Sequence, residues 1–175
     1  MKYIFYRLRP GASLTGGQFG PSQYRWTLWR PSISGIWPPD PRITDLAWAA
    51  MHFLHLFSNN CYAQLLAHNE DQLIHRSAVY PRWSRYPFMG VADLQIGNTW
   101  THPEYRRSGL AAAAIRRIVA HYESPDRAFW YVTDSQNHAS IATAERAGFE
   151  RVGLGARHAR FGLRWLGFYA VETIE

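Results

Sequence analysis

The chain has 175 residues, which suffices for one well-packed domain and is short for two. Its 8 Trp, 10 Tyr and 9 Phe, within a hydrophobic content of 47%, supply material for a core and exclude a disordered chain. The 19 basic residues outnumber the 13 acidic ones and give a net charge of +6, which favours anionic partners such as phosphates, nucleotides or nucleic acid.

The basic residues are almost all arginine, because Lys2 is the only lysine among the 19. Arginine suits bidentate contacts with phosphate better than lysine does. A GC-rich genome produces the same bias without any function, so both explanations stay open.

The single cysteine, Cys61, excludes an internal disulfide and a multi-cysteine metal site. We therefore expect a reducing, cytoplasmic compartment and no bound metal. The longest apolar run, residues 46–57, has 12 residues and contains two histidines, which is too short to span a membrane. The first ten residues lack the apolar core of a signal peptide. The sequence thus predicts neither secretion nor a membrane partner.

The first half of the chain predicts strands, a loop region and one helix. Aromatic and branched residues before a proline predict an opening strand, and repeated Gly, Pro and Ser predict an ordered loop region. Helix formers after Thr44 or Asp45, either of which can act as the N-cap, predict a helix. A polar turn between two apolar runs predicts a hairpin. In chain order these are a strand at 2–8, the loop region at 11–42 with a short strand at 24–29, the helix at 44–57, and a hairpin of 61–67 and 72–80.

The second half predicts strands that alternate with two helices. Apolar residues recur at helical spacing over 110–122, and Gly148 closes a second helix. Gly97 and Asn98 interrupt a long strand, which is typical of a bulge or of a ligand close to the backbone. The elements are a strand at 88–102, a helix at 110–122, a strand at 128–133, a helix at 137–149, and a hairpin of 151–161 and 164–173. This order predicts an α+β fold, a mixed sheet with helices on its faces and a βαβ unit at its centre.

The turn before the first of these two helices, RRSGLA at residues 106–111, combines charge with a glycine. Unpaired N–H groups and the helix dipole make a helix N-terminus a phosphate site. Gly109 lets the backbone approach a bulky anion, and Arg106 and Arg107 add charge. On this motif alone, an ordinary strand-to-helix turn with solvated arginines is the alternative.

Further motifs follow in a characteristic order. THPEYRRSGLA, at the end of the long strand, is followed by N-x-x-S and then by ERAGF. Residues 88–155 therefore resemble the cofactor half of the GCN5-related N-acetyltransferase (GNAT) superfamily. The superfamily pattern of Arg or Gln, two residues, Gly, one residue, and Gly or Ala is met by Arg106, Gly109 and Ala111. Asn137 matches the asparagine that opens the second motif.

This resemblance implies a GNAT-like fold with a mixed, mostly antiparallel sheet, a βαβ cofactor half and helices on both faces. It implies one acetyltransferase domain over 1–175, with an acceptor-side half at 1–87, an acetyl-CoA half at 88–155 and closing strands at 156–175.

Acetyl-CoA is the implied cosubstrate, with no metal. Backbone N–H groups of 106–111 would hold its pyrophosphate, and the strand around Trp100 would pair with its pantetheine arm. Asn137 would bind the pantetheine and can also be a helix N-cap. The implied cofactor-binding residues are Trp100, Thr101, Arg106, Arg107, Ser108, Gly109, Leu110, Ala111, Asn137 and Ser140.

The resemblance leaves the catalytic groups less typical. Direct acetyl transfer to an amine needs no covalent nucleophile, and the chain has no G-x-S-x-G elbow. Ala144 stands where many members carry a tyrosine acid, and Gln95, which cannot take a proton, stands where they carry a glutamate base. Ser140 matches a serine of the RimL-like branch and is a candidate to reach the leaving sulfur, although a first-turn helical serine is the alternative. Asp93 is a candidate base acting through water, or a structural strand-end aspartate.

The candidate catalytic residues are therefore Ser140, Asp93 and Gln95. A non-catalytic CoA-binding protein stays open.

The acceptor side is the least typical part of the chain. Residues 77–111 look similar to acetyltransferases of bacterial surface-polysaccharide biosynthesis, which would make the acceptor an amino sugar, free or nucleotide-linked. Several aromatic and arginine side chains suit such an acceptor, and packing in the core is the alternative for the aromatic ones. They are Trp26, Trp29, Trp37, Trp83, Tyr86, Arg82 and Arg85.

Other acceptors and partners remain. The RimL-like Ser140 suggests a protein or peptide N-terminus instead of a small-molecule amine. A basic nucleic-acid-binding module is the rival outside enzymes, and the absence of a recognised binding motif argues against it. The sequence leaves open whether the chain forms a homodimer.

Overall fold

The structure is a computed structural model that describes residues 2–12, 14 and 23–173. The part of the expected loop region at 13 and 15–22 lies outside the described residues. Eight strands and three α-helices follow in the order β1 (Lys2–Leu8), β2 (Arg25–Trp29), α1 (Ile43–Phe53), β3 (Ala63–Asn69), β4 (Gln72–Pro81), β5 (Leu94–Thr101), α2 (Leu110–Tyr122), β6 (Phe129–Asp134), α3 (His138–Arg146), β7 (Glu150–Arg160) and β8 (Leu163–Thr173). A short 3-10 turn, Pro103–Tyr105, precedes α2.

The strands form one sheet in the order β2-β3-β4-β5-β6-β1-β7-β8. Only β5 and β6 pair in parallel, and every other neighbouring pair is antiparallel. The parallel pair is joined through α2, as a crossover connection requires. The mixed, mostly antiparallel sheet with a central βαβ unit is therefore confirmed.

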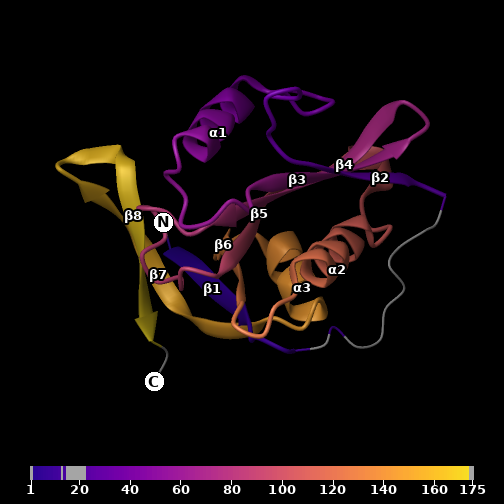
Figure 1. The fold of residues 1–175 in the computed structure, drawn as a ribbon. Helices are drawn as coiled ribbons and strands as arrows, with labels where there is room; N and C mark the ends of the chain where they lie inside the picture. The colour runs from indigo at the N-terminus through magenta and orange to yellow at the C-terminus, as the bar shows by residue number, and fades with distance from the viewer. Residues whose placement is uncertain (1, 13, 15–22, 174–175) are drawn as a thin grey trace.

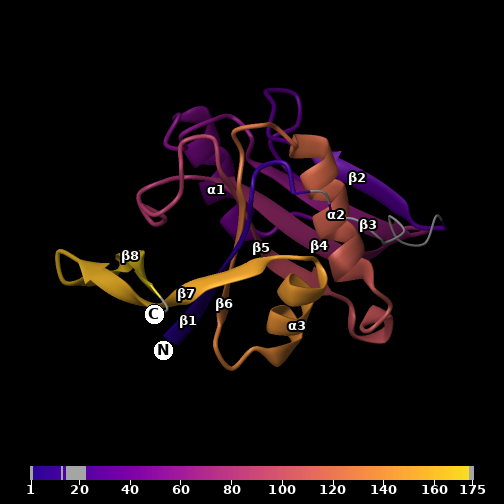
Figure 2. The same ribbon diagram turned by 90° about the horizontal axis from the view of Figure 1, so that it is seen from below.

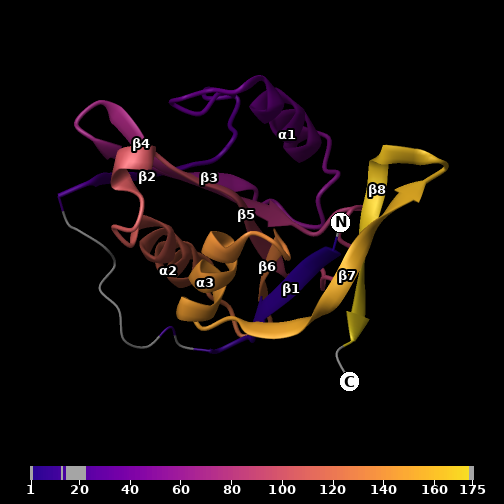
Figure 3. The ribbon, with the colours of Figure 1, turned by 180° about the vertical axis from the view of Figure 1, so that it is seen from behind.

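The helices cover both faces of the sheet, as predicted. Figure 1 shows α1 on one face and α2 and α3 on the other, and the reverse view in Figure 3 shows α2 and α3 side by side. The hairpin of β7 and β8 reaches away from the rest of the sheet (Figure 2).

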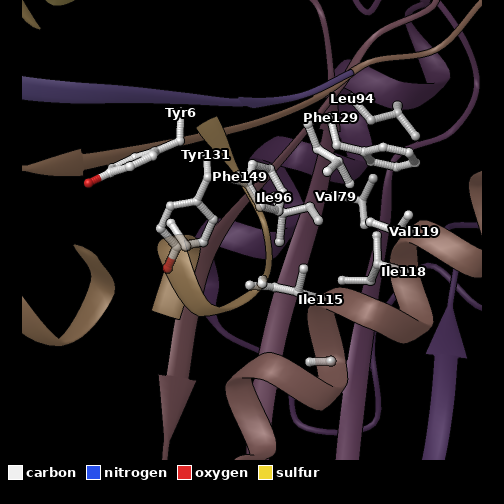
Figure 4. Packing of buried hydrophobic residues seen from close by; sticks show 14 of the residues in the cluster. Tyr6, Val79, Leu94, Ile96, Ile115, Ile118, Val119, Phe129, Tyr131 and Phe149 are labelled. Atoms are coloured by element: carbon white, nitrogen blue, oxygen red, sulfur yellow. The ribbon is translucent and has the colours of Figure 1, made fainter. Parts of the chain in front are cut away.

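The larger core lies between the sheet and the pair α2 and α3. Ile115 and Ile118 of α2 are buried against Ile96 of β5 and Tyr131 of β6 (Figure 4). Apolar residues at helical spacing on one face of α2 explain this packing. A smaller core beneath α1 consists of Phe57, Tyr62, Ala78 and Tyr80, against which Trp29, Trp48, Met51 and Trp83 pack.

The boundaries of α1 differ from the prediction. The N-cap is Arg42, not Thr44 or Asp45, and Asp45 lies three residues into the helix. Its carboxylate accepts the Arg42 backbone N–H at 2.7 Å, which satisfies that N–H from inside the helix. The helix ends at Phe53 rather than at residue 57, and His55 adopts a positive φ of 53° just beyond it.

The strand expected at 88–102 is also shorter. β5 begins only at Leu94, because a turn closes before it: the Asp93 N–H donates to the Gly90 carbonyl at 3.2 Å. The predicted interruption is confirmed, since the register between β4 and β5 shifts opposite Gly97 and Asn98 has a φ of 48°.

Candidate active site

The two parallel strands at the centre of the sheet, β5 and β6, pair over three residues and then diverge. Leu94, Gln95 and Ile96 pair with β6, but β5 then continues to pair only with β4, while β6 pairs only with β1. A cavity of about 750 Å³ lies at this opening. Its described lining residues from the two strands are Gln95, Gly97, Asn98, Thr99, Tyr131, Val132, Thr133 and Asp134.

This cavity, which we call the central cavity, reaches both faces of the sheet. Thr44 and Trp48 of α1 line it from one face, and Ser140 of α3 lines it together with Asn137 from the other. Because α1 and α3 cover opposite faces, two ligands can enter from opposite sides and meet between β5 and β6.

The N-terminus of α2 offers main-chain donors on the α3 side. Its first intrahelical bond runs from Ala113 N to Gly109 O at 2.9 Å, so the N–H groups of residues 110–112 precede it, and no side chain caps them. Gly109 has a φ of 82°, which favours glycine. Arg106 and Arg107 are exposed beside it. These groups fit a pyrophosphate.

Three other predicted residues of this turn, Ser108, Leu110 and Ala111, differ in burial and bonding. The Ser108 hydroxyl donates to the Tyr105 carbonyl at 2.5 Å, which ties the turn to the preceding 3-10 element. Leu110 is buried, whereas Ala111 is half-buried. Leu110 therefore anchors the helix start while the neighbouring backbone stays near the surface.

Trp100 and Thr101 lie at the end of β5 and do not line the central cavity. They pair with Arg76 and His75 of β4. Beyond Ile96 the edge of β5 that faces β6 has no strand partner among the described residues, so its backbone groups face the opening. An amide-containing chain can pair with such an edge as a strand would.

Asn137 and Ser140 lie together at the start of α3. The Asn137 side chain accepts the Ser140 N–H at 3.1 Å, which is the N-cap role compatible with cofactor binding. Both residues line the central cavity, and the Ser140 side chain is half-buried there.

Gln95 and Asp93 have different surroundings. Gln95 lines the central cavity, is buried, and its Oε1 has no hydrogen-bond partner within the described part of the chain. Asp93 lies outside this lining, and its two carboxylate oxygens accept N–H groups from three residues. The donors are Gly90 N at 2.8 Å, Ala128 N at 3.0 Å and Trp130 Nε1 at 2.8 Å. The structure therefore brings together Gln95 and Ser140 but not Asp93.

Sequence reasoning missed Asp134, which is the one carboxylate among the described residues that line the central cavity. Its Oδ1 accepts the Gln136 N–H at 2.8 Å, and the residue is half-buried. Its place directly after the apolar run of β6 was an available signal, because polar groups at such strand ends commonly line sites in α/β arrangements.

Tyrosines from four strands, β1, β4, β6 and β8, and Tyr86 from the loop after β4 also line the central cavity, and of these only Tyr86 was predicted. Burial raises the pKa of Tyr80 well above its usual value, and burial likewise raises the pKa of Tyr86 and of Tyr169. These phenols therefore stay protonated at neutral pH and act as hydrogen-bond donors, not as bases.

Of the seven aromatic and arginine residues predicted for the acceptor, two line the central cavity and five do not. Tyr86 and Arg85 line the central cavity. Trp83 packs against the smaller core, as does Trp29. The remaining three, Trp26, Trp37 and Arg82, do not line this cavity.

Among the described residues, no group of three or more His, Cys, Asp or Glu side chains is placed to hold a metal ion. None of the described helices combines the length and apolar character needed to cross a bilayer.

The sequence model of the acetyltransferase (GNAT) family matches residues 23–149. The chain therefore belongs to the acetyltransferase (GNAT) family, whose enzymes take acetyl groups from acetyl-CoA. No curated protein sequence matches the chain significantly.

Solved structures share the fold at low sequence identity. A GNAT-family protein from Novosphingobium aromaticivorans is 13% identical with a TM-score of 0.55, over 87% of this chain and 61% of that one. A GCN5-related N-acetyltransferase from Sphaerobacter thermophilus is 9% identical with a TM-score of 0.57, over 87% and 49%. A tandem GNAT protein from the clavulanic acid biosynthesis pathway is 17% identical with a TM-score of 0.53, over 86% and 50%. The chain thus spans about half to three fifths of each of these structures, and the likeness shows the fold alone.

Proposed function

We propose that the chain is an acetyl-CoA-dependent N-acetyltransferase that moves an acetyl group directly to a primary amine. The observation that carries this proposal is the opening between β5 and β6, lined from both faces, with the uncapped N-terminus of α2 on the face that α3 also covers. Acetyl-CoA would lie on the α2 and α3 face, and the acceptor amine would enter from the α1 face.

The cofactor would be held chiefly by backbone groups. The N–H groups of residues 107–111 would bind the pyrophosphate, since the Arg106 N–H already donates to the Pro103 carbonyl at 3.3 Å. The side chains of Arg106 and Arg107 would add charge. The free edge of β5, near Trp100 and Thr101, would pair with the pantetheine arm. Asn137 and Ser140 would contact the end of that arm.

Three side chains of the central cavity have proposed catalytic roles. Gln95 would orient the acceptor, because its buried, unpaired Oε1 can accept a hydrogen bond from the amine. Asp134 would take the amine proton through a water molecule, in place of Asp93, whose oxygens are already hydrogen-bonded. Ser140 would donate a hydrogen bond to the leaving sulfur. Bound acetyl-CoA supplies the acetyl group as an activated thioester.

An amino sugar, free or nucleotide-linked, remains our proposal for the acceptor. Arg85 and Tyr86 in the lining support it, since an arginine suits phosphate and a tyrosine suits a sugar face. A peptide N-terminus, favoured by the RimL-like Ser140, is the second candidate.

Gly109 provides the test. Its position has open space for a side chain, because an added Cβ meets nothing within 4 Å, but the positive φ strains any other residue. Gly109→Glu and Gly109→Gln share this strain and differ only in charge. We expect Gly109→Glu to abolish CoA binding in calorimetry and acetyl transfer in a thiol-release assay, and Gly109→Gln to retain measurable binding. Equal CoA affinity in wild type and Gly109→Glu would refute the placement.

A further inference from the structure

A second hollow adjoins the central cavity on the α1 face. It encloses about 400 Å³ between α1, the loop after β4 and the hairpin of β7 and β8. The two hollows share Thr44, Trp48 and Arg85, so these three residues border both of them. We call the second one the side pocket.

The side pocket has an apolar, aromatic wall. Ala47, Trp48 and Met51 of α1 line it together with Trp83 of the loop, and the rings of Trp48 and Trp83 meet edge to face at a centroid distance of 5.5 Å. Trp83 Nε1 is buried without a hydrogen-bond partner among the described residues. A buried donor without a partner costs free energy unless a ligand accepts from it. Aromatic walls favour a planar ring, and about 150 Å³ already accommodates a benzene molecule.

Arginine side chains line both hollows. Arg85 lies 4.7 Å from the Trp83 ring centroid and lines both hollows, and Arg160 lines the side pocket. Arg42 lines the central cavity. The described lining of the side pocket includes no carboxylate, and Asp134 of β6 is the one carboxylate in the described lining of the central cavity.

We infer that the acceptor amine carries a flat ring and an anionic group, with the ring in the side pocket and the anion at Arg85. This inference rests on the proposed function and defines the substrate class of the same site. The ring is an aryl group, as in an aromatic amino acid, or a nucleobase, as in a nucleotide-linked amino sugar. A free amino sugar has neither feature and would leave the side pocket empty.

Five amines separate these features in a thiol-release assay with saturating acetyl-CoA. Phenylalanine has a ring and an anion, phenylalaninamide lacks the anion, and alanine lacks the ring. Glucosamine lacks both, and UDP-glucosamine adds a nucleobase and a diphosphate to it. We expect kcat/KM at least tenfold higher for phenylalanine than for alanine and phenylalaninamide if the ring is an aryl group. A preference of that size for UDP-glucosamine over glucosamine identifies a nucleobase instead.

Two alanines of α1 provide matched variants. Ala47 and Ala50 are both exposed, but only Ala47 lines the side pocket. Ala47→Phe fills the pocket from a solvent-facing position, and Ala50→Phe carries the same helix-propensity cost. We expect Ala47→Phe to reduce the ratio of kcat/KM for the ring-bearing amine over its ringless partner to about one, while Ala50→Phe keeps the wild-type ratio.

The outcomes separate this inference from the proposed function. Acetyl-CoA binding with transfer to all five amines within threefold of one another would overturn the inference and leave the function standing. Equal ratios in Ala47→Phe and wild type would also overturn it. Failure to bind acetyl-CoA in calorimetry would overturn both.

Discussion

Asp93 and Asp134 are both aspartates beside the central strands, yet their surroundings give them different chemistry. Asp93 is buried, and its carboxylate accepts three N–H groups from two segments, one from Gly90 and two from Ala128 and Trp130. It therefore joins the turn before β5 to the start of β6. Asp134 borders the central cavity and uses one oxygen in a local turn. Burial and donor number, which the sequence does not reveal, distinguish the structural carboxylate from the candidate base.

Asp93→Asn should destabilise the fold by about 2–3 kcal/mol, because an amide NH₂ would replace one acceptor oxygen and face N–H donors. Urea unfolding at neutral pH measures this cost. Asp126→Asn, at an exposed loop position, is the control and should change stability by at most about 0.5 kcal/mol. A variant of wild-type stability that has lost acetyl transfer would instead establish Asp93 as the base.

Asp134→Asn should lower kcat by about a hundredfold or more, since general base catalysis contributes that much in typical enzymes. The amide oxygen can still accept the Gln136 N–H, so we expect the fold and acetyl-CoA affinity to persist. Activity should recover as the pH approaches the pKa of the acceptor amine, because solvent then removes the proton. An unchanged kcat and pH profile would exclude Asp134 as the base.

His75 makes stability depend on pH. It is completely buried between Thr101 Oγ1 at 2.8 Å and Ser77 Oγ at 2.9 Å. Desolvation by burial lowers its pKa from 6.5 to about 4. The unfolded chain therefore binds more protons between these values, so stability falls as the pH drops from 6.5 towards 4.

Relative to His75→Gln, the wild-type free energy of unfolding should fall by about 2–3 kcal/mol more between pH 7 and pH 4.5. Urea titrations at the two pH values measure this difference. His138→Gln, at an exposed position, should keep the wild-type pH dependence. Parallel pH dependence in wild type and His75→Gln would contradict the expected shift.

At the scale of elements, local patterns predicted most of the strands and helices. The apolar spacing of α2 and the hairpin of β3 and β4 are properties of contiguous residues, so the sequence contains their signal. The start of α1 and the start of β5 were wrong for a shared reason. In both places an aspartate, Asp45 or Asp93, bonds backbone N–H groups and displaces the boundary.

Asp45 also fixes α1 onto the sheet. Its carboxylate accepts Gln64 Nε2 at 2.8 Å and lies 3.6 Å from Arg76 Nη1, and Asp45 and Arg76 are each only 1% exposed. Arg42 and Thr44, at the start of the same helix, line the central cavity. This buried pair therefore helps to fix the position of the residues of α1 that line the central cavity.

Asp45→Ala should cost about 3–5 kcal/mol, because it leaves the Arg76 guanidinium buried without its partner. Arg76→Met in the Asp45→Ala background should recover part of that loss, since no buried charge then remains. Urea unfolding of the two single variants and the double variant gives the coupling free energy. Strictly additive losses would show that the two side chains do not act as a pair.

At the scale of the whole molecule, the opening between β5 and β6 joins segments that are far apart in the chain. The turn proposed to bind phosphate has a signal in the sequence because its residues are contiguous. The lining that joins Arg42, Gln95 and Ser140 has no such signal, because it depends on which strands are neighbours and where they part. The family resemblance predicted residues for the proposed cofactor half. The residues of the proposed acceptor half could be identified only from the arrangement of the strands and helices in space.

Acetyl-CoA binding should stabilise the whole fold, because a ligand that binds only the native state raises its free energy of unfolding. At a concentration one hundred times its Kd, we expect about 2.7 kcal/mol and a corresponding rise in the thermal midpoint. The net charge of +6 makes a nonspecific anion effect the main competing explanation, so a short oligonucleotide serves as the control. A rise with acetyl-CoA that persists at 0.3 M salt and is absent with the oligonucleotide supports the cofactor site. A shift with the oligonucleotide alone, lost as salt is added, would show that the arginines contact nucleic acid and that the opening in the sheet does not bind acetyl-CoA.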